Sequence, residues 1–243
     1  MKKELNIHFS KGHRQHHIKK MLLVLILMCG LIIASPALAE DNVYTVIGVK
    51  TWYCSWDLGG SYKSQQSFLM GPSLKIAKDN FFCGVTYLIS LNDYEFDKSV
   101  SVSRSDLDLM MGYMLHPRIG LVTGYKAIET KIDSNNTNIA NQNYTSPVFG
   151  VTTNYPISLG SLDFILTANL NYLPVSIMHY NKQEKKSTDW GDNNNGYSGE
   201  AGIAFMIGDN IAINTGLKYQ LFKWINGSND KFKGITLSLD YRF

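Results

Sequence analysis

Hydrophobic and polar residues alternate along most of the chain after residue 40. The last ten residues show this most clearly, because apolar side chains occupy every second position from Ile235 to Phe243 and polar or small residues fill the gaps. Strict alternation gives a β-strand one apolar face and one polar face. Ten segments follow this pattern, so the sequence predicts strands near 44–56, 67–77, 81–91, 103–115, 119–130, 146–155, 161–173, 197–207, 211–222 and 233–243.

The connections between these segments alternate between short and long. Four are short and rich in Gly, Pro, Asn or Asp, at 78–80, 116–118, 156–160 and 208–210. Five are long and polar, near 57–66, 92–102, 131–145, 174–196 and 223–232. Outer-membrane β-barrels have short periplasmic turns and longer extracellular loops. The sequence therefore predicts an all-β fold, a transmembrane antiparallel up-and-down β-barrel of ten strands, with eight or twelve as alternatives and both ends in the periplasm.

The two faces of the predicted strands differ in charge. The face that includes Ile235 and Leu237 carries no Lys, Arg or Asp at mid-strand, as lipid contact requires, because a charge at the membrane midplane costs about 2–4 kcal/mol. The opposite face carries most of the strand glycines, with Gly199 as the exception. It also carries the charges that we expect to face the lumen: Lys50, Lys75, Arg104, Asp106, Asp108, Lys126, Asp163, Glu200, Lys218, Asp240 and Arg242. A soluble β-sandwich would instead have a polar outer face.

Residues 1–39 have the pattern of a secretory signal peptide. A basic start precedes an apolar run from Met21 to Ile33, and Ala37-Leu-Ala39 forms a small-residue cleavage site. We therefore expect residues 1–39 to be removed and residues 40–243 to form the barrel domain. The alternative is a membrane anchor, but the apolar run is short for a span. The histidines His13, His16 and His17 fall within this leader.

Removal of the leader changes the charge of the chain. Taking the six Lys and Arg and the one Glu of residues 1–39 from the totals of 23 and 20 leaves 17 basic and 19 acidic residues, a net charge of −2. A basic nucleic-acid-binding surface is therefore not expected. Cys54 and Cys83 remain, and the predicted topology puts them near opposite ends of the barrel, too far apart for a disulfide. We expect two free thiols.

The leader, the alternating strands and the terminal Leu239-Asp-Tyr-Arg-Phe243 resemble the small outer-membrane β-barrel proteins of Gram-negative bacteria. In that family a last strand ending in Phe, with an aromatic residue two positions earlier, is a signal for the barrel-assembly machinery, and Tyr241 and Phe243 match it. The resemblance covers all of residues 40–243 but does not identify a subfamily. It implies a monomer in the bacterial outer membrane, in contact with lipid and lipopolysaccharide.

Nucleophilic catalysis finds little support, because only His116 and His179 remain after the leader and neither lies in a His-x-Ser motif. Asp106-Leu-Asp108 is the sharpest catalytic candidate. It resembles the Asp-x-Asp pair of the ten-stranded omptin proteases and is expected near the extracellular rim. The partner Asp-x-His pair of that family is missing. We predict that the two carboxylates pair with lumen cations such as Arg104, Lys126 or Lys75 and that the protein is not an enzyme.

The lumen charges are nearly balanced, which predicts a small barrel closed by ion pairs and a structural or surface-interaction role. A narrow passive channel for ions or small solutes is the alternative, and an omptin-like or lipid-modifying enzyme is a more distant one. No cofactor or metal site is expected, and the sequence does not identify an extracellular ligand. All four tryptophans are predicted on the extracellular side, either as an aromatic patch for a ligand or as ordinary membrane anchoring and loop packing: Trp52, Trp56, Trp190 and Trp224.

Overall fold

The computed structural model describes residues 43–58, 63–96, 99–135, 137–160, 162–181, 186–189, 194–223 and 229–243. The predicted signal peptide, residues 1–39, lies outside them. The described chain consists of strands: β1 (Val43–Asp57), β2 (Ser67–Lys78), β3 (Phe81–Ser90), β4 (Tyr94–Glu95), β5 (Val100–His116), β6 (Ile119–Ser134), β7 (Thr137–Leu159), β8 (Leu162–Asn181), β9 (Lys186–Asp189), β10 (Asn194–Ile207), β11 (Ile211–Lys223) and β12 (Asn229–Arg242).

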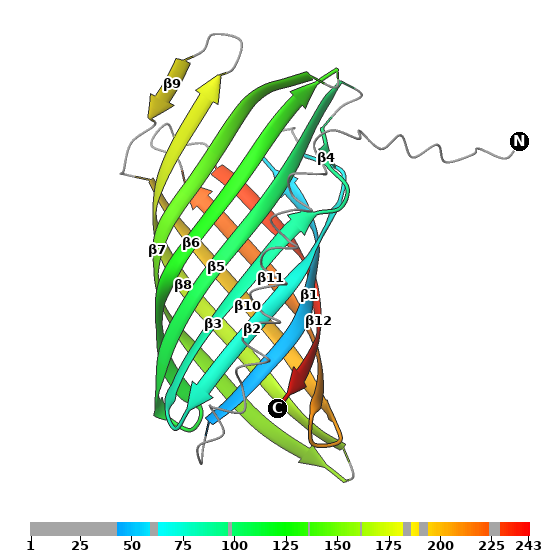
Figure 1. Cartoon of the computed structure of the whole chain (residues 1–243), viewed down its shortest axis with the longest axis vertical. Helices are drawn as coiled ribbons and strands as arrows, with labels where there is room; N and C mark the ends of the chain where they lie inside the picture. Colours follow the sequence, from blue (N-terminus) through cyan, green and yellow to red (C-terminus); the bar gives the residue numbers. More distant parts are fainter. Residues whose placement is uncertain are drawn as a thin grey trace, which may run out of the picture.

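Ten of these strands form a closed antiparallel barrel (Figure 1). Neighbours in sequence pair around the ring, with β10 beside β8 and the last strand, β12, beside the first, β1. The closing pair runs from Val46 opposite Arg242 to Asp57 opposite Lys231. The two-residue β4 pairs with β5, and the four-residue β9 pairs with β8 where the β8–β10 pairing has ended. The predicted fold class and strand count are confirmed.

The short connections all lie at one end of the barrel, the turn end, together with Val43 and Phe243. The long connections lie at the other end, the loop end. Here several strands are longer than predicted, and the predicted loop 131–145 is largely strand, since β6 and β7 continue to a tight turn near Asn135. A ladder joins backbone groups and needs no apolar side chains. The polar sequence therefore marks where the strands leave the apolar zone and not where they end.

The outward face is apolar, as predicted. Its exposed side chains recur at every second position of the strands and include Leu109, Leu121, Val151, Leu217 and Leu237. Along β12 the alternation from Ile235 to Phe243 gives an outward row of apolar side chains interrupted by no charge. Within the described residues, no helix is long and apolar enough to cross a membrane.

Inward-facing glycines make room for a larger side chain on the neighbouring strand. A methyl group on Gly112 would occupy the space of the Phe82 ring directly opposite, and one on Gly196 would meet the Phe222 ring. Polar side chains lie in the same way over Gly48 and Gly150: Asp240 and Asn171. A small barrel has little interior space, so each large inward residue needs a small partner across the ladder.

Gly234 on the closing strand has no room for a side chain. A methyl group there would approach the Tyr53 carbonyl and lie 2.6 Å from Cys54 Cα, and backbone atoms cannot rotate away. We expect Gly234→Ala to lower the free energy of unfolding by about 1–3 kcal/mol, as overpacking does. The measurement is guanidinium unfolding of the folded protein in detergent micelles.

Gly199→Ala is the matched control for this prediction, because the nearest atom to a methyl group there is 3.5 Å away. It should change stability by no more than about 1 kcal/mol in either direction. Equal stability of the Gly234→Ala variant and the parent protein would show that β1 and β12 separate more easily than their close approach indicates.

Candidate functional site

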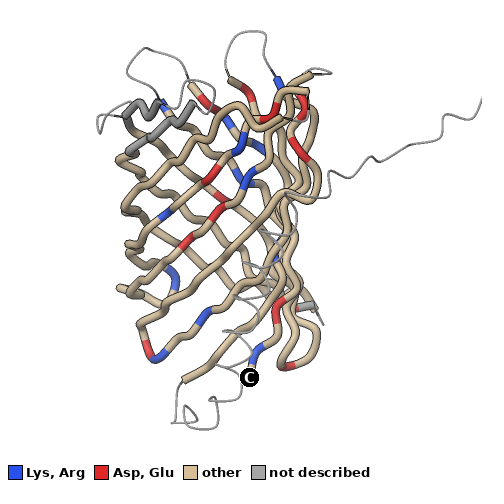
Figure 2. The backbone as a smooth tube through the Cα atoms, turned by 45° about the horizontal axis from the view of Figure 1, so that its top comes forward, with Lys and Arg blue, Asp and Glu red and all other residues tan. Residues whose placement is uncertain are grey.

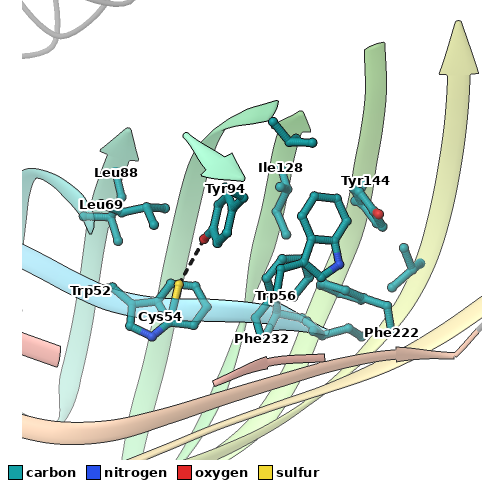
Figure 3. Packing of buried hydrophobic residues seen from close by; sticks show 14 residues of the cluster. Trp52, Cys54, Trp56, Leu69, Leu88, Tyr94, Ile128, Tyr144, Phe222 and Phe232 are labelled. Atoms are coloured by element: carbon teal, nitrogen blue, oxygen red, sulfur yellow. Dashed lines mark hydrogen bonds between the residues drawn. The ribbon is translucent and has the colours of Figure 1, made fainter. Parts of the chain in front are cut away.

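Large side chains fill the lumen toward the loop end (Figure 3). This aromatic cluster draws residues from every strand of the ring except β10, and from β4: Trp52, Cys54, Trp56, Leu69, Leu88, Tyr94, Val102, Ile128, Tyr144, Val148, Leu173, Val175, Phe222 and Phe232. The Trp56 ring lies 4.9 Å from the Phe232 ring and 5.8 Å from the Tyr94 ring, and Tyr144 lies 5.2 Å from Phe222. These contacts span the barrel from β1 to β7.

The predicted extracellular tryptophan patch needs correction. Trp52 is 0% exposed and Trp56 is 2% exposed, and both belong to the aromatic cluster inside the barrel. Neither therefore presents a surface to a ligand or anchors the protein in lipid. Both occupy the same face of β1 as Gly48 and Lys50, so the alternation already placed them inside. Trp190 and Trp224 lie outside the described residues.

The thiol and two of the hydroxyl groups within the cluster have polar partners, whereas the buried indole N–H groups of Trp52 and Trp56 have none. The Cys54 thiol and the Tyr94 hydroxyl lie 3.0 Å apart, and the Tyr144 hydroxyl donates to Asp230 at 2.8 Å. Tyr94 belongs to β4, in the loop between β3 and β5, and burial raises its pKa well above the usual value. It therefore remains a neutral hydroxyl at physiological pH. Cys54 and Cys83 are both free, Cys54 buried and Cys83 exposed on the outward face.

Arg104 joins the aromatic cluster to the charged groups below it. Its guanidinium lies 4.0 Å from the Phe232 ring and 5.2 Å from the Trp52 ring. It donates to both carboxylate oxygens of Asp106, at 2.5 and 2.7 Å, and to the Gln220 side chain at 2.8 Å. The planar guanidinium suits this combination of ring stacking and two-point carboxylate binding, which a lysine could not make.

The other inward charges continue from Arg104 as an ion-pair network. Figure 2 marks the positions of the charged residues along the backbone. Lys126 contacts Asp106 at 3.6 Å and Asp108 at 2.5 Å, and Lys218 lies 3.8 Å from Asp108. Across the lumen, Lys50 pairs with Glu200 at 2.8 Å, and the Thr236 hydroxyl also donates to Glu200. Each of these lysines therefore has an acidic partner. Their mutual attraction offsets the free-energy cost of burying the charges.

A cavity of about 570 Å³ lies on the turn-end side of this network. The network supplies one boundary, with Lys50, Asp108 and Glu200 among the lining residues. Amide and hydroxyl side chains line much of the rest: Ser73, Thr86, Thr152, Asn154, Thr167, Asn169, Asn171, Ser198, Asn214, Thr215, Thr236 and Ser238. Of the aromatic cluster, only Val148 and Leu173 border the cavity. The lumen is therefore packed toward the loop end and hollow toward the turn end.

The remaining predicted lumen charges lie toward the turn end. Lys75 is 3.6 Å from Asp240, and the Asn214 side chain donates to the same carboxylate at 2.9 Å. Arg242 is exposed and lies 4.4 Å from the Tyr44 ring, and Asp163 is exposed beside the β7–β8 turn. These residues therefore do not belong to the central network.

The Asp106 and Asp108 carboxylates lie within the lumen. They are not at the extracellular rim, where the sequence predicts them. Asp106 is 1% exposed, and Arg104 and Lys126 hold it, while Lys126 and Lys218 hold Asp108. His116 lies at the turn end of β5, ten residues and about 33 Å along the strand from Asp106. The backbone of His179 lies opposite Gln142 in the extended part of β8. In the part of the chain that the structure describes, no three His, Cys, Asp or Glu side chains gather as metal ligands would.

Some residues of the site were not singled out from the sequence. Phe222, Phe232 and Gln220 share their strand faces with the lumen charges Lys218 and Asp240, so alternation was a usable signal for them. Tyr94 carried no such signal. It lies in a segment expected to be a loop, and only the fold of that loop over the barrel brings it to Cys54.

A closed ring of ten strands with a lipid-compatible outer face and a polar, packed interior defines an outer-membrane β-barrel protein. The family model for the outer membrane protein beta-barrel domain matches residues 25–243, and the chain belongs to that family. The protein is therefore placed in the bacterial outer membrane.

Solved structures share the fold at low sequence identity. The outer membrane protease OmpT from Escherichia coli superposes with a TM-score of 0.58 at 12% identity, over 84% of this chain and 98% of that chain. The beta domain of the Bordetella autotransporter BrkA gives a TM-score of 0.47 at 10% identity, over 84% and 99%. Ail of Yersinia pestis gives 0.34 at 14% identity, over 83% and 99%. No curated protein sequence matches.

The ion pair between Arg104 and Asp106 should be essential to stability. Arg104→Met removes the cation and leaves a buried carboxylate with fewer partners, which costs about 3–5 kcal/mol. Unfolding in detergent micelles, followed by the heat-dependent shift in gel mobility, measures the loss.

Two further variants test the cause of this loss. In Arg104→Met/Asp106→Leu the unpaired charge is gone, so most of the stability should return. Arg242→Met, which removes an exposed arginine that also lies over an aromatic ring, should have an effect of less than about 1 kcal/mol. A double variant as unstable as Arg104→Met would contradict the interpretation.

Proposed function

We propose that this protein is a non-enzymatic structural barrel of the outer membrane, closed across its lumen, whose extracellular extension contacts other surfaces. The observation that carries the proposal is the continuous packing of the aromatic cluster onto Arg104 and the ion-pair network. A solute that crossed the barrel would have to displace buried rings and separate buried ion pairs. Both are costly, because such a core is close-packed and an unpaired buried charge is unfavourable.

The shape of the loop end supports the surface role. By the asymmetry of the connections, the loop end is extracellular. The hairpin of β6 and β7, and β8 with β9, extend the sheet at this end beyond the strands on the other side of the barrel (Figure 1). The extension is rich in polar residues such as Asn138, Asn141, Gln142 and Asn143. A paired sheet raised above the membrane is suited to contact with a partner outside the cell.

A narrow passive channel is the second candidate, and the cavity favours it. That cavity already occupies the turn-end part of the lumen. A path through the barrel would therefore be complete if the ion-pair network and the aromatic cluster opened. Movement of Trp52, Phe232 and Arg104 together would be required, because the guanidinium stacks on both rings.

An enzymatic role requires carboxylates that are free to act on water or substrate. Asp106 and Asp108 are instead bound by three cations, which supports a structural role for both. We expect no peptide cleavage by the protein in lipopolysaccharide-containing micelles, measured with a quenched fluorescent peptide library. Cleavage that disappears in Asp108→Asn, while the heat-dependent mobility shift of the folded barrel is retained, would contradict this part of the proposal.

Planar-bilayer recording separates the closed barrel from the channel. The parent protein, folded in detergent and added to the bilayer, should give no stable single-channel steps. The variant Trp52→Ala/Trp56→Ala/Phe232→Ala removes three large rings of the aromatic cluster and should give frequent brief openings.

The control for this recording replaces three outward tyrosines: Tyr125→Ala/Tyr172→Ala/Tyr219→Ala. These side chains face lipid, so the variant should conduct no more than the parent. Stable and reproducible steps from the parent protein would overturn the closed barrel in favour of the channel. In that case Lys126→Gln should change the ion selectivity of the steps, because Lys126 lines the path.

A further inference from the structure

Three lysines gather on the outward face of the barrel at the loop end: Lys223, Lys231 and Lys233, here called the lysine cluster. Lys223 ends β11, and the other two lie near the start of β12, the strand beside it. In the register of the two strands, Lys233 lies opposite Tyr219, Lys231 opposite Leu221, and Lys223 opposite Asn229. Three successive outward-facing pairs of one ladder therefore each present a cation.

The lysines share a face with lipid-exposed residues. Lys231 and Lys233 continue the outward row of Ile235, Leu237 and Leu239 by alternation, and Lys223 continues that of Leu217 and Tyr219. Lys223 and Lys233 are exposed and Lys231 is half-buried. These side chains therefore point away from the lumen and take no part in the ion-pair network.

The length of the apolar row sets the depth of the cluster. The segment from Ile235 to Phe243 has nine residues, which matches the ~9–11 residues that a tilted strand needs to cross the hydrocarbon layer. Lys233 therefore lies where the hydrocarbon layer ends on the extracellular side, and Lys231 and Lys223 lie one and two outward-facing pairs further out. This is the depth of the lipid headgroups.

Aromatic neighbours support this placement. Tyr219 and Tyr53 are exposed on the outward face next to Lys233, and the Lys223 ammonium lies 5.5 Å from the Tyr197 ring. Tyrosines with an apolar body and a polar hydroxyl prefer the membrane–water boundary. These tyrosines therefore lie on the membrane side of the lysine cluster.

The local charge is positive. The acidic side chain that faces the cluster from β1 is Asp57, opposite Lys231, and Ser55 lies opposite Lys233. Three cations and one acid leave a net charge of +2 on this sector. At the same end of the barrel, Lys131 on β6 is buried and lies 3.8 Å from Glu129, so its charge is compensated.

We propose that the lysine cluster binds the phosphate groups of a lipid A headgroup in the outer leaflet. Ammonium groups bind phosphate as point charges, and three on neighbouring rungs can contact one phosphorylated headgroup together. Apolar side chains immediately below them accept the acyl chains of the same molecule. The inference depends on the outer-membrane location and the outward face, and it is independent of whether the lumen conducts.

Native mass spectrometry of the folded protein in neutral detergent tests the proposal. Lipid A with both phosphates is titrated against enzymatically dephosphorylated lipid A, and the fraction of protein with bound lipid is measured. The parent should prefer the phosphorylated form. Lys233→Gln should weaken its binding about fivefold, which corresponds to about 1 kcal/mol for each basic residue near an anionic lipid surface, and the triple Lys→Gln variant should lose the preference.

Lys131→Gln is the control, since it removes a lysine near the loop end of β6 that is buried and already has an acidic partner. It should retain the parent's preference. Heat-dependent gel mobility confirms folding, and the three single variants decide the question if the triple variant does not fold. Equal binding of both lipids by the parent, an equal loss in Lys131→Gln, or full displacement of the lipid by millimolar inorganic phosphate would each overturn the proposal.

Discussion

The pairing of the first strand with the last is the constraint on which the rest of the structure depends. Backbone N–H and C=O groups in lipid have no water to bind, so an open sheet edge would leave a row of them unpaired at a cost of several kcal/mol each. The ladder between β1 and β12 removes both edges at once. It also brings Gly234 against the β1 backbone, so closure requires a residue without a side chain at that point.

Closure with ten strands leaves a narrow interior, and its contents follow from that width. Inward side chains from opposite walls meet, which is why rings from β1, β7, β11 and β12 contact one another. Glycines opposite large residues relieve the crowding between neighbouring strands. Charges in such a space need partners, and Arg104 combines two solutions by binding Asp106 while it stacks on Phe232. The same narrowness therefore produces both the aromatic cluster and the ion-pair network.

The sequence predicted the strands well where they cross the membrane and less well outside it. Alternation is enforced by two opposed environments, lipid and lumen, so it is strong from Ile235 to Phe243. Beyond the lipid both faces of β6 and β7 meet water or loop, the alternation weakens, and the extended hairpin resembles a loop in sequence. Trp52 and Trp56 show a different limit. The alternation along β1 indicates an inward face for both, whereas the general preference of aromatic residues for membrane surfaces indicates the opposite, and the buried rings follow the alternation.

The sequence by itself determined which residues face lipid, which face inward and on which side the long connections lie, because each depends only on the period of a strand and the chemistry of a turn. The tertiary structure decided which inward residues meet. The tilt of the strands brings Lys50 on β1 to Glu200 on β10, and Arg104 on β5 to Gln220 on β11, pairs that are far apart in sequence and lie on strands that do not pair with each other. Contacts across a lumen depend on tilt and register together, and only the closed barrel sets both.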